Sequence, residues 1–259
     1  MTRVALLQID VSDSEQPHER ITRVLDVVRA QSGKCDIAIL PELWPIGAFN
    51  SSALHDNAQL RDGSLVSDLQ SVAREAGMWL HGGSFVEKHD EGISNTAVVI
   101  RPDGTIAAMY RKIHLFGFDE GEAIMVERGH DIVTIADTPL GNAGIATCYD
   151  LRFPELFRAQ AAQNADSLVI SSGWPTPRIN HWRVLIQARA IENQAWVIAC
   201  NEVGTNGLVT LGGHSMIVNP MGEIVCEAGE SEEILYADVD VTLAQSWRQN
   251  FPVQRDRVL

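Results

Sequence analysis

An apolar segment that ends at a cysteine constrains the fold of this chain more than any other stretch. Residues 144–148 are expected to form a short β-strand that closes at Cys148. Asp150 is a good N-cap, and residues 153–162 have the apolar periodicity of a helix. We therefore expect a strand that turns directly into a helix, with the thiol at the junction.

Two interpretations of Cys148 follow from this position. A thiol that faces the positive end of a helix should have a lowered pKa, which makes the thiolate available for nucleophilic catalysis. Alternatively, Cys148 is a small buried apolar side chain, as most free cysteines are. This segment alone leaves both interpretations open.

Two charged residues follow predicted strands elsewhere in the chain. A buried strand over residues 37–40 leads through a proline to Glu42, at the strand end where α/β sheets collect catalytic groups. Lys112 follows a predicted strand over residues 105–110 and precedes an apolar loop that contains glycine. Taken singly, each has an ordinary explanation, as a solvated glutamate and as a surface lysine.

Together the three segments resemble the nitrilase superfamily of carbon–nitrogen hydrolases. The motifs are LPELW at residues 40–44, YRKIHLF at residues 110–116 and CYDLRFPE at residues 148–155. Three such motifs in this chain order make the match specific. The similarity extends from Val4 to Val253, and it is greatest to the branch of small omega-amidase-like enzymes.

The resemblance implies a Glu–Lys–Cys catalytic triad. Cys148 would be the nucleophile, Glu42 the general base and Lys112 the group that stabilises the tetrahedral intermediate. The implied enzyme hydrolyses a small amide to a carboxylic acid and ammonia through a cysteine thioester, without a cofactor. An omega-amide of a dicarboxylic acid is the first candidate substrate, and N-carbamoyl amides and aliphatic amides use the same triad. An acyl-transferring or non-catalytic, ligand-binding relative is the alternative class.

Many family members have a second glutamate near the lysine that positions substrate or relays protons. Glu120, Glu122 and Glu127 are the candidates in this chain. The family places this residue at a fixed spacing before a Gly-Asp-like turn, which this chain shows at residues 129–130. That spacing selects Glu122.

Three residues are candidates for contacts with the substrate. The backbone N–H of Tyr149, next to the cysteine, would be a second donor to the oxyanion. Trp174 follows a predicted strand over residues 167–171, where it either lines the pocket or packs at the strand end. Arg178 lies in the same segment and would receive a substrate carboxylate.

The composition is ordinary for a globular protein and narrows the range of partners. The 259 residues are 45% hydrophobic and 21% charged, and the formal net charge of −14 argues against binding to nucleic acid or to anionic membranes. No apolar run is long enough for a transmembrane helix, and residues 1–10 are expected to be a first strand rather than a signal peptide.

Cysteine and glycine spacing add further expectations. The four cysteines include no CxxC pair, and the histidines lack metal-ligand spacing, so we expect reduced thiols, a cytoplasmic protein and no metal site. The glycine pairs at residues 82–83 and 212–213 are interpreted as turns rather than phosphate loops.

Strands alternate with helices and hairpins, which predicts two mixed sheets with helices outside. The resemblance implies the same α/β architecture, a four-layer αββα sandwich, and we expect one domain over residues 1–259. Family members usually pair as homodimers through two helices, here residues 153–164 and 180–194, and the polar tail over residues 248–259 would pack on the partner subunit. The other expected strands are residues 4–9, 79–86, 96–100, 132–135, 196–200, 215–218, 223–227 and 234–239, and the other expected helices are residues 17–31, 65–76 and 242–250.

Overall fold

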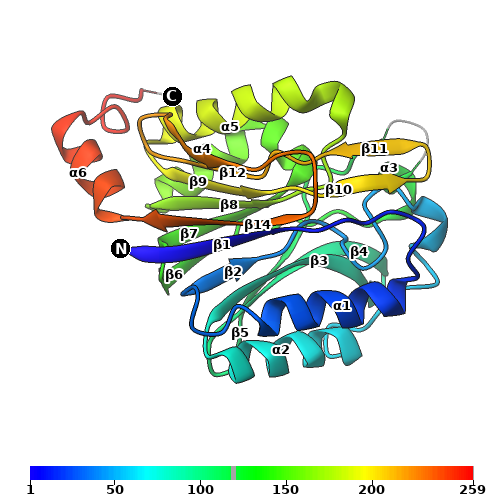
Figure 1. Cartoon of the computed structure of the whole chain (residues 1–259). Coiled ribbons are helices and arrows are strands. Elements are labelled where there is room, and N and C mark those ends of the chain that lie inside the picture. The colour runs from blue at the N-terminus through cyan, green and yellow to red at the C-terminus, as the bar shows by residue number, and fades with distance from the viewer. Residues whose placement is uncertain (118–120, 259) are drawn as a thin grey trace.

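The computed structural model of the chain describes residues 1–117 and 121–258. Two six-stranded β-sheets face each other, and helices cover the outer face of each sheet (Figure 1). The four-layer αββα sandwich expected for this chain is therefore confirmed.

The first sheet has the strand order β14-β1-β2-β3-β4-β5. Strands β1, β2 and β3 run parallel to one another, and the remaining pairs are antiparallel. Helices α1 and α2 lie on its outer face (Figure 1). The elements of this half are β1 (Thr2–Gln8), α1 (Pro17–Arg29), β2 (Ile37–Ile39), α2 (Ser64–Ala76), β3 (Trp79–His89), β4 (Gly92–Ile100), β5 (Ile106–Arg111) and β14 (Glu233–Val239).

The second sheet has the order β13-β12-β9-β8-β7-β6, and its strands β7, β8 and β9 are parallel. Helices α4 and α5 cover its outer face (Figure 1). The elements of this half are β6 (Thr134–Thr138), β7 (Gly141–Thr147), α4 (Pro154–Ala162), β8 (Ser167–Ser171), α5 (Ile179–Asn193), β9 (Trp196–Cys200), β12 (Met216–Val218) and β13 (Ile224–Glu227).

Smaller elements connect the two halves and close the chain. A hairpin of β10 (Val203–Asn206) and β11 (Val209–Gly212) follows β9, and the short helix α3 (Glu122–Met125) follows β5. The hairpin and α3 are absent from the predicted elements. The remaining elements are α6 (Thr242–Asn250) and 3-10 turns at Ser51–Ala53, Cys148–Arg152 and Thr176–Arg178.

Alternate residues of a single strand enter different layers of the core. In β1, Val4 and Leu6 pack between the two sheets, whereas Ala5 and Leu7 pack in the layer that includes α1 and α2. A third apolar layer lies between the second sheet and its helices and includes Phe157. Because both faces of the central strands are buried, their sequences are continuous apolar runs rather than alternating ones.

The glycine pair at residues 82–83 lies inside strand β3, so its interpretation as a turn is wrong. The pairing of β3 with β4 shifts register between His81 and Ser84, and Gly83 has a φ of +65°. A Cβ atom on Gly83 would lie 2.0 Å from the carbonyl oxygen of Pro41. The pair therefore forms a β-bulge that admits the backbone of the loop after β2.

Several polar groups lie just beyond strand ends that face the same region. Glu42 follows β2, Cys148 follows β7 and Gly173 follows β8, all of them strands of the parallel sets. The carboxyl ends of such strands are the usual place for ligand sites in α/β sheets. Among residues 1–117 and 121–258, none of the helices combines the length and apolarity that a membrane span requires.

Candidate active site

Glu42 lies in the loop after β2, where its carboxylate is buried and accepts three hydrogen bonds. Oε1 accepts from Lys112 Nζ at 2.7 Å and from Asn95 Nδ2 at 2.8 Å. Oε2 accepts from the backbone N–H of Gly173 at 2.9 Å. Donors from three separate elements hold the carboxylate in one orientation, as a general base requires.

Lys112 follows β5, and its side chain is only 1% exposed. Its Nζ donates to Glu42 Oε1 at 2.7 Å and to Glu122 Oε2 at 2.6 Å. Burial alone would lower the pKa of Lys112, but the carboxylates of Glu122 and Glu42 raise it well above its ordinary value. Lys112 is therefore a fixed cation in the site.

Of the three glutamate candidates, Glu122 is the one that lies against Lys112. It begins α3, and its carboxylate also accepts from Asn95 Nδ2 at 2.7 Å. Burial and the charge of Glu42 raise the pKa of Glu122, and Lys112 acts in the opposite direction. Glu127 is exposed at a different pocket, and Glu120 lies outside the described residues.

Cys148 follows β7 directly and has a φ of +46°, a conformation that non-glycine residues seldom adopt. Its Sγ lies 4.0 Å from the carbonyl oxygen of Gly173. The thiol lines the same pocket as Glu42 and Lys112. The strained turn thus presents the sulfur to the base and the cation together.

Two expectations for this turn are wrong. Asp150 is not the N-cap of the helix, because α4 begins only at Pro154 and Phe153 precedes it. The pKa of Cys148 is raised rather than lowered: burial has the largest effect, the charge of Glu42 adds to it, and Lys112 and the Ser172 hydroxyl act in the opposite direction. The thiol is therefore protonated at rest and needs a base to become a nucleophile.

Asp150 instead links the strand that precedes Lys112 to the turn that carries the cysteine. Its buried carboxylate accepts from Tyr110 Oη at 2.7 Å and from the Thr147 amide at 2.9 Å. It also accepts from the amide of His114 at 3.0 Å and contacts the Nδ1 atom of that histidine at 2.8 Å. One carboxylate therefore sets the relative position of the segments that carry Lys112 and Cys148.

We expect Asp150→Asn to weaken both folding and turnover, because an amide nitrogen cannot accept the bonds that a carboxylate oxygen accepts. Bonds to a charged group contribute roughly 1.5–3 kcal/mol each, so the free energy of unfolding should fall by about 3 kcal/mol. Turnover should fall by tenfold to about 100-fold through misplacement of the two segments. Urea unfolding and kcat measure the two effects, with Asp103→Asn, in an exposed turn, as the control. Wild-type values for both quantities would contradict this role of Asp150.

The three predicted catalytic residues and Glu122 surround a cavity of about 390 Å³. It is open to solvent, and much of its wall is apolar. This volume suits a small ligand rather than a polymer. The lining residues are Glu42, Leu43, Ala48, Phe49, Ser51, Leu54, Lys112, Phe116, Gly117, Gly121, Glu122, Cys148 and Gly173.

The three predicted substrate contacts lie around this cavity but are not among the described residues that line it. Trp174 is buried, contacts Trp182 at a ring distance of 5.6 Å and donates Nε1–H to the Arg178 carbonyl, which is the packing role. Tyr149 packs edge-on against Phe116, and the guanidinium of Arg178 lies 5.4 Å from the centre of the Phe116 ring. Because Phe116 lines the cavity, Arg178 is close to its rim.

Two functional groups escaped prediction. Asn95 donates from β4 to both Glu42 and Glu122, and the Gly173 amide orients Glu42. Asn95 is one of several polar residues in β4, with nothing to distinguish it from its neighbours, and a backbone amide has no sequence signature. No local pattern could have identified either group.

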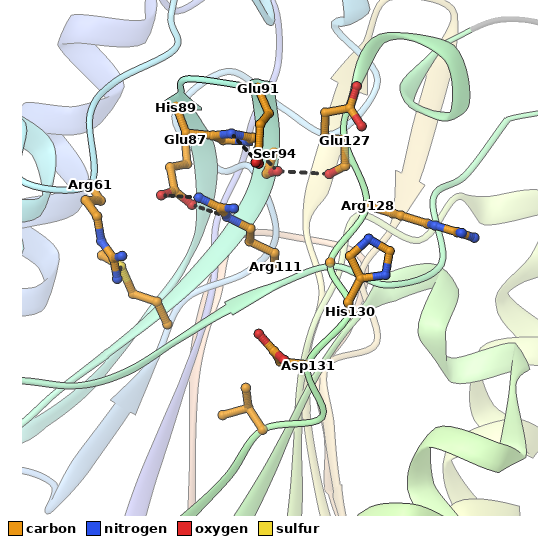
Figure 2. A pocket seen from close by; sticks show the side chains of 13 residues that line it. Arg61, Glu87, His89, Glu91, Ser94, Arg111, Glu127, Arg128, His130 and Asp131 are labelled. Carbon is orange, nitrogen blue, oxygen red and sulfur yellow. Dashed lines mark hydrogen bonds and ion pairs between the residues drawn. The ribbon is translucent and has the colours of Figure 1, made fainter.

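A larger pocket, of about 700 Å³, lies elsewhere and is lined by charged side chains (Figure 2). Arg111 donates to Glu87 at 2.9 and 3.0 Å, and His89 contacts Ser94 at 2.9 Å. Glu127 borders this pocket. Its lining includes the Arg111–Glu87 ion pair and no member of the predicted triad.

Comparisons with known proteins find similarity over nearly the whole chain. The sequence model described as carbon-nitrogen hydrolase matches residues 3–249. The 2-oxoglutaramate amidase of Paenarthrobacter nicotinovorans is 38% identical over 261 residues, which cover 98% of this chain and 88% of that protein. The 2-oxoglutaramate amidase of Bacillus subtilis (strain 168) is 34% identical over 253 residues, which cover 98% of this chain and 96% of that protein.

Among solved structures, Saccharomyces cerevisiae Nit3, a member of branch 10 of the nitrilase superfamily, superposes with a TM-score of 0.90 at 30% sequence identity. The match covers 100% of this chain and 97% of that chain. Similarity of this extent includes both sheets and their covering helices.

Proposed function

The chain belongs to the carbon–nitrogen hydrolase family, and we propose that it is an amidase that releases ammonia from a small amide through a thioester on Cys148. The observation that carries this proposal is the placement of Lys112 between two buried carboxylates at the cavity that Cys148 lines. A base, a fixed cation and a thiol are the groups that amide hydrolysis by a cysteine requires.

In the first half of the proposed reaction, Glu42 takes the proton of the Cys148 thiol as the sulfur attacks the amide carbonyl carbon. The carbonyl oxygen becomes an oxyanion, which Lys112 Nζ–H and the backbone N–H of Tyr149 stabilise. The carbon–nitrogen bond then breaks, and the protonated Glu42 gives its proton to the departing nitrogen. Ammonia leaves, and the acyl group stays on sulfur as a thioester.

In the second half, water replaces the amine. Glu42 accepts a proton from the water as its oxygen attacks the thioester carbon, and the same donors stabilise the second oxyanion. The carbon–sulfur bond breaks, the proton on Glu42 returns to the sulfur, and a carboxylic acid is released. Glu122 and Asn95 hold Lys112 and Glu42 in place through both halves.

We propose an omega-amide of a dicarboxylic acid as the substrate. The relatives named 2-oxoglutaramate amidase support this class, and so does the small cavity with Arg178 near its rim. A rim cation pairs with the free carboxylate while the amide at the other end reaches Cys148.

The test is ammonia release across a panel of omega-amides of dicarboxylates, N-carbamoyl amino acids, aliphatic amides and a nitrile. Release mainly from the omega-amides would support the proposal, and release from another group would replace the substrate class but keep the mechanism. Release from no member of the panel would contradict the proposal and favour an acyl-transferring or ligand-binding role.

We expect Arg178→Met to raise KM for omega-amides of dicarboxylates and to leave KM for neutral aliphatic amides unchanged. A hydrogen bond to a charged group contributes roughly 1.5–3 kcal/mol, so the increase should be tenfold to about 100-fold. Arg183→Met is the control, because Arg183 pairs with Glu227 at 2.6 Å and does not line the cavity. An equal increase in KM for neutral amides would contradict this role, because it would show that Arg178 does not bind the substrate carboxylate.

We also propose a cytoplasmic protein with one hydrolase domain over residues 1–259 that pairs as a homodimer through α4 and α5. Val184 and Ile191 of α5 are 65% and 55% exposed, which favours a covered surface there. The carbonyl of Phe251 accepts from Gln194 Nε2 at 2.7 Å, so the C-terminal tail packs against the end of α5. In the proposed dimer this tail would border the partner subunit.

A further inference from the structure

Glu202 is a buried carboxyl group for which the mechanism above has no use. It follows β9 and is 0% exposed. Neither of its carboxyl oxygens has a hydrogen-bond partner in the described part of the chain. Burial of a carboxylate without hydrogen-bond donors destabilises the folded state, so such a group is either uncharged or has a function that offsets this cost.

The Glu202 carboxyl lies behind Gly173, a wall residue of the catalytic cavity. A Cβ atom on Gly173 would lie 2.7 Å from Glu202 Oε2 and 2.2 Å from the Cβ of Ala48. Ala48 and Gly173 both line the cavity. Glu202 and Ala48 therefore pack closely against the face of Gly173 on which other residues carry a side chain.

Gly173 contacts both reacting groups of the proposed mechanism. Its N–H donates to Glu42 Oε2 at 2.9 Å, and its carbonyl oxygen lies 4.0 Å from Cys148 Sγ. Asn201 holds the next residue, since its side chain accepts from the amide of Trp174 at 2.6 Å. The residues that follow β9 thus support the turn that orients the base.

The charges around Glu202 favour its protonated form. Burial and the negative charge of Glu42 raise the pKa of Glu202 well above its ordinary value. The Arg20 charge opposes them less strongly, and so does the nearby Ala48 amide, which does not meet hydrogen-bond geometry with the carboxyl. Burial raises the pKa of Cys200, at the end of β9, and the charge of Glu202 would add to that effect. The charge of Lys112 does not stabilise an ionised Glu202, because Lys112 already pairs with the carboxylates of Glu42 and Glu122.

We propose that Glu202 is an uncharged positioning residue, whose carboxylic acid packs behind Gly173 and Ala48 and keeps the Gly173 amide on Glu42. The inference rests on the proposed function in one respect, the role of Glu42 as the base for Cys148. If Glu202 ionised, its charge would repel the Glu42 carboxylate across the Gly173 peptide and loosen this arrangement.

The protonation state is tested by comparing urea unfolding of the wild type and Glu202→Gln between pH 5 and pH 9, a range that follows from the ordinary value of about 4.3 for glutamate. A carboxyl with a raised pKa in the folded state binds its proton more tightly there, so its contribution to stability is lost as pH rises toward the folded value. Glutamine does not titrate. The urea midpoint of Glu202→Gln minus that of the wild type should therefore increase as pH rises. A difference that stays constant between pH 5 and pH 9 would overturn the proposal.

Positioning is tested by the rate at which iodoacetamide alkylates Cys148, followed by mass spectrometry, and by kcat. Glu202→Ala removes the support behind Gly173 and should slow both by tenfold to about 100-fold, whereas Glu202→Gln should restore both to within about threefold of the wild type. Ile198→Ala, a truncation of another buried β9 residue, is the control for general loosening.

Equal rates for Glu202→Ala and Ile198→Ala would overturn the positioning role. Failure of the proposed function is distinguishable, because a wild type that releases no ammonia still has a measurable alkylation rate and unfolding midpoint. Slower alkylation in Glu202→Ala would then support the inference on its own.

Discussion

Replacing Cys148 with alanine is expected to abolish ammonia release from every amide in the panel. Removal of a catalytic nucleophile costs at least about 10⁴-fold in turnover, and Cys148 is the only thiol among the described residues that line the cavity. Folding should change little, because the lost sulfur contributes about 1 kcal/mol of burial. Alanine and cysteine both carry a Cβ atom, so the positive φ at residue 148 strains them alike. The measurements are ammonia release and urea unfolding.

Cys35→Ala is the matched control for this variant. Cys35 is also buried, but it contacts Met78 at 3.6 Å and does not line the cavity. Mass spectrometry of the quenched reaction should find the acyl group on the peptide that contains Cys148 in the wild type. Turnover by Cys148→Ala within tenfold of the wild type would contradict a cysteine nucleophile.

The parts of this protein that could be predicted from sequence are those fixed by local pattern. The strand that ends at residue 147 and the helix that starts at Pro154 each have their own apolar periodicity and their own start and stop signals. Glu42, Lys112 and Cys148 could be identified because each stands in a short motif that follows a strand. The structure then brings the three together at one cavity.

The errors arose where a distant segment decides the outcome. Gly82 and Gly83 have the sequence of a turn, but the backbone of Pro41 approaches Gly83 closely, and this contact joins β3 to the loop after β2. The thiol pKa was expected to follow a helix N-terminus. Burial and the charge of Glu42, a residue far away in the sequence, outweigh the effect of the helix.

One omission was avoidable. The hairpin of β10 and β11 turns at Gly207-Leu208 between residues rich in valine and threonine. Gly207 has a φ of +62° and takes the first central position of the loop, where two-residue hairpin loops favour glycine. Asn206 holds the cavity wall, because its Oδ1 accepts from the amide of Phe49 at 2.8 Å. This contact spans most of the chain and could not be inferred from sequence.

Replacing Lys112 with methionine is expected to reduce turnover by about 10²- to 10³-fold or more, since loss of one oxyanion donor alone costs roughly 3–4 kcal/mol. It should also destabilise the fold at neutral pH by about 3–5 kcal/mol, the cost of removing one partner from a buried ion pair. The reason is that Glu42 and Glu122, both bonded to Asn95, would then face each other without a cation.

The pH dependence and a double variant separate these two effects of Lys112. Without the cation, the buried carboxyl pair holds a proton more tightly in the folded state than in the unfolded state, so the stability deficit should be small near the ordinary glutamate value of about 4.3 and grow as pH rises. Lys112→Met combined with Glu122→Gln removes the repulsion and should recover much of the unfolding free energy without recovering turnover. A double variant that regained turnover would show that Lys112 serves only to neutralise Glu122, and the oxyanion role would have to be assigned to backbone donors alone.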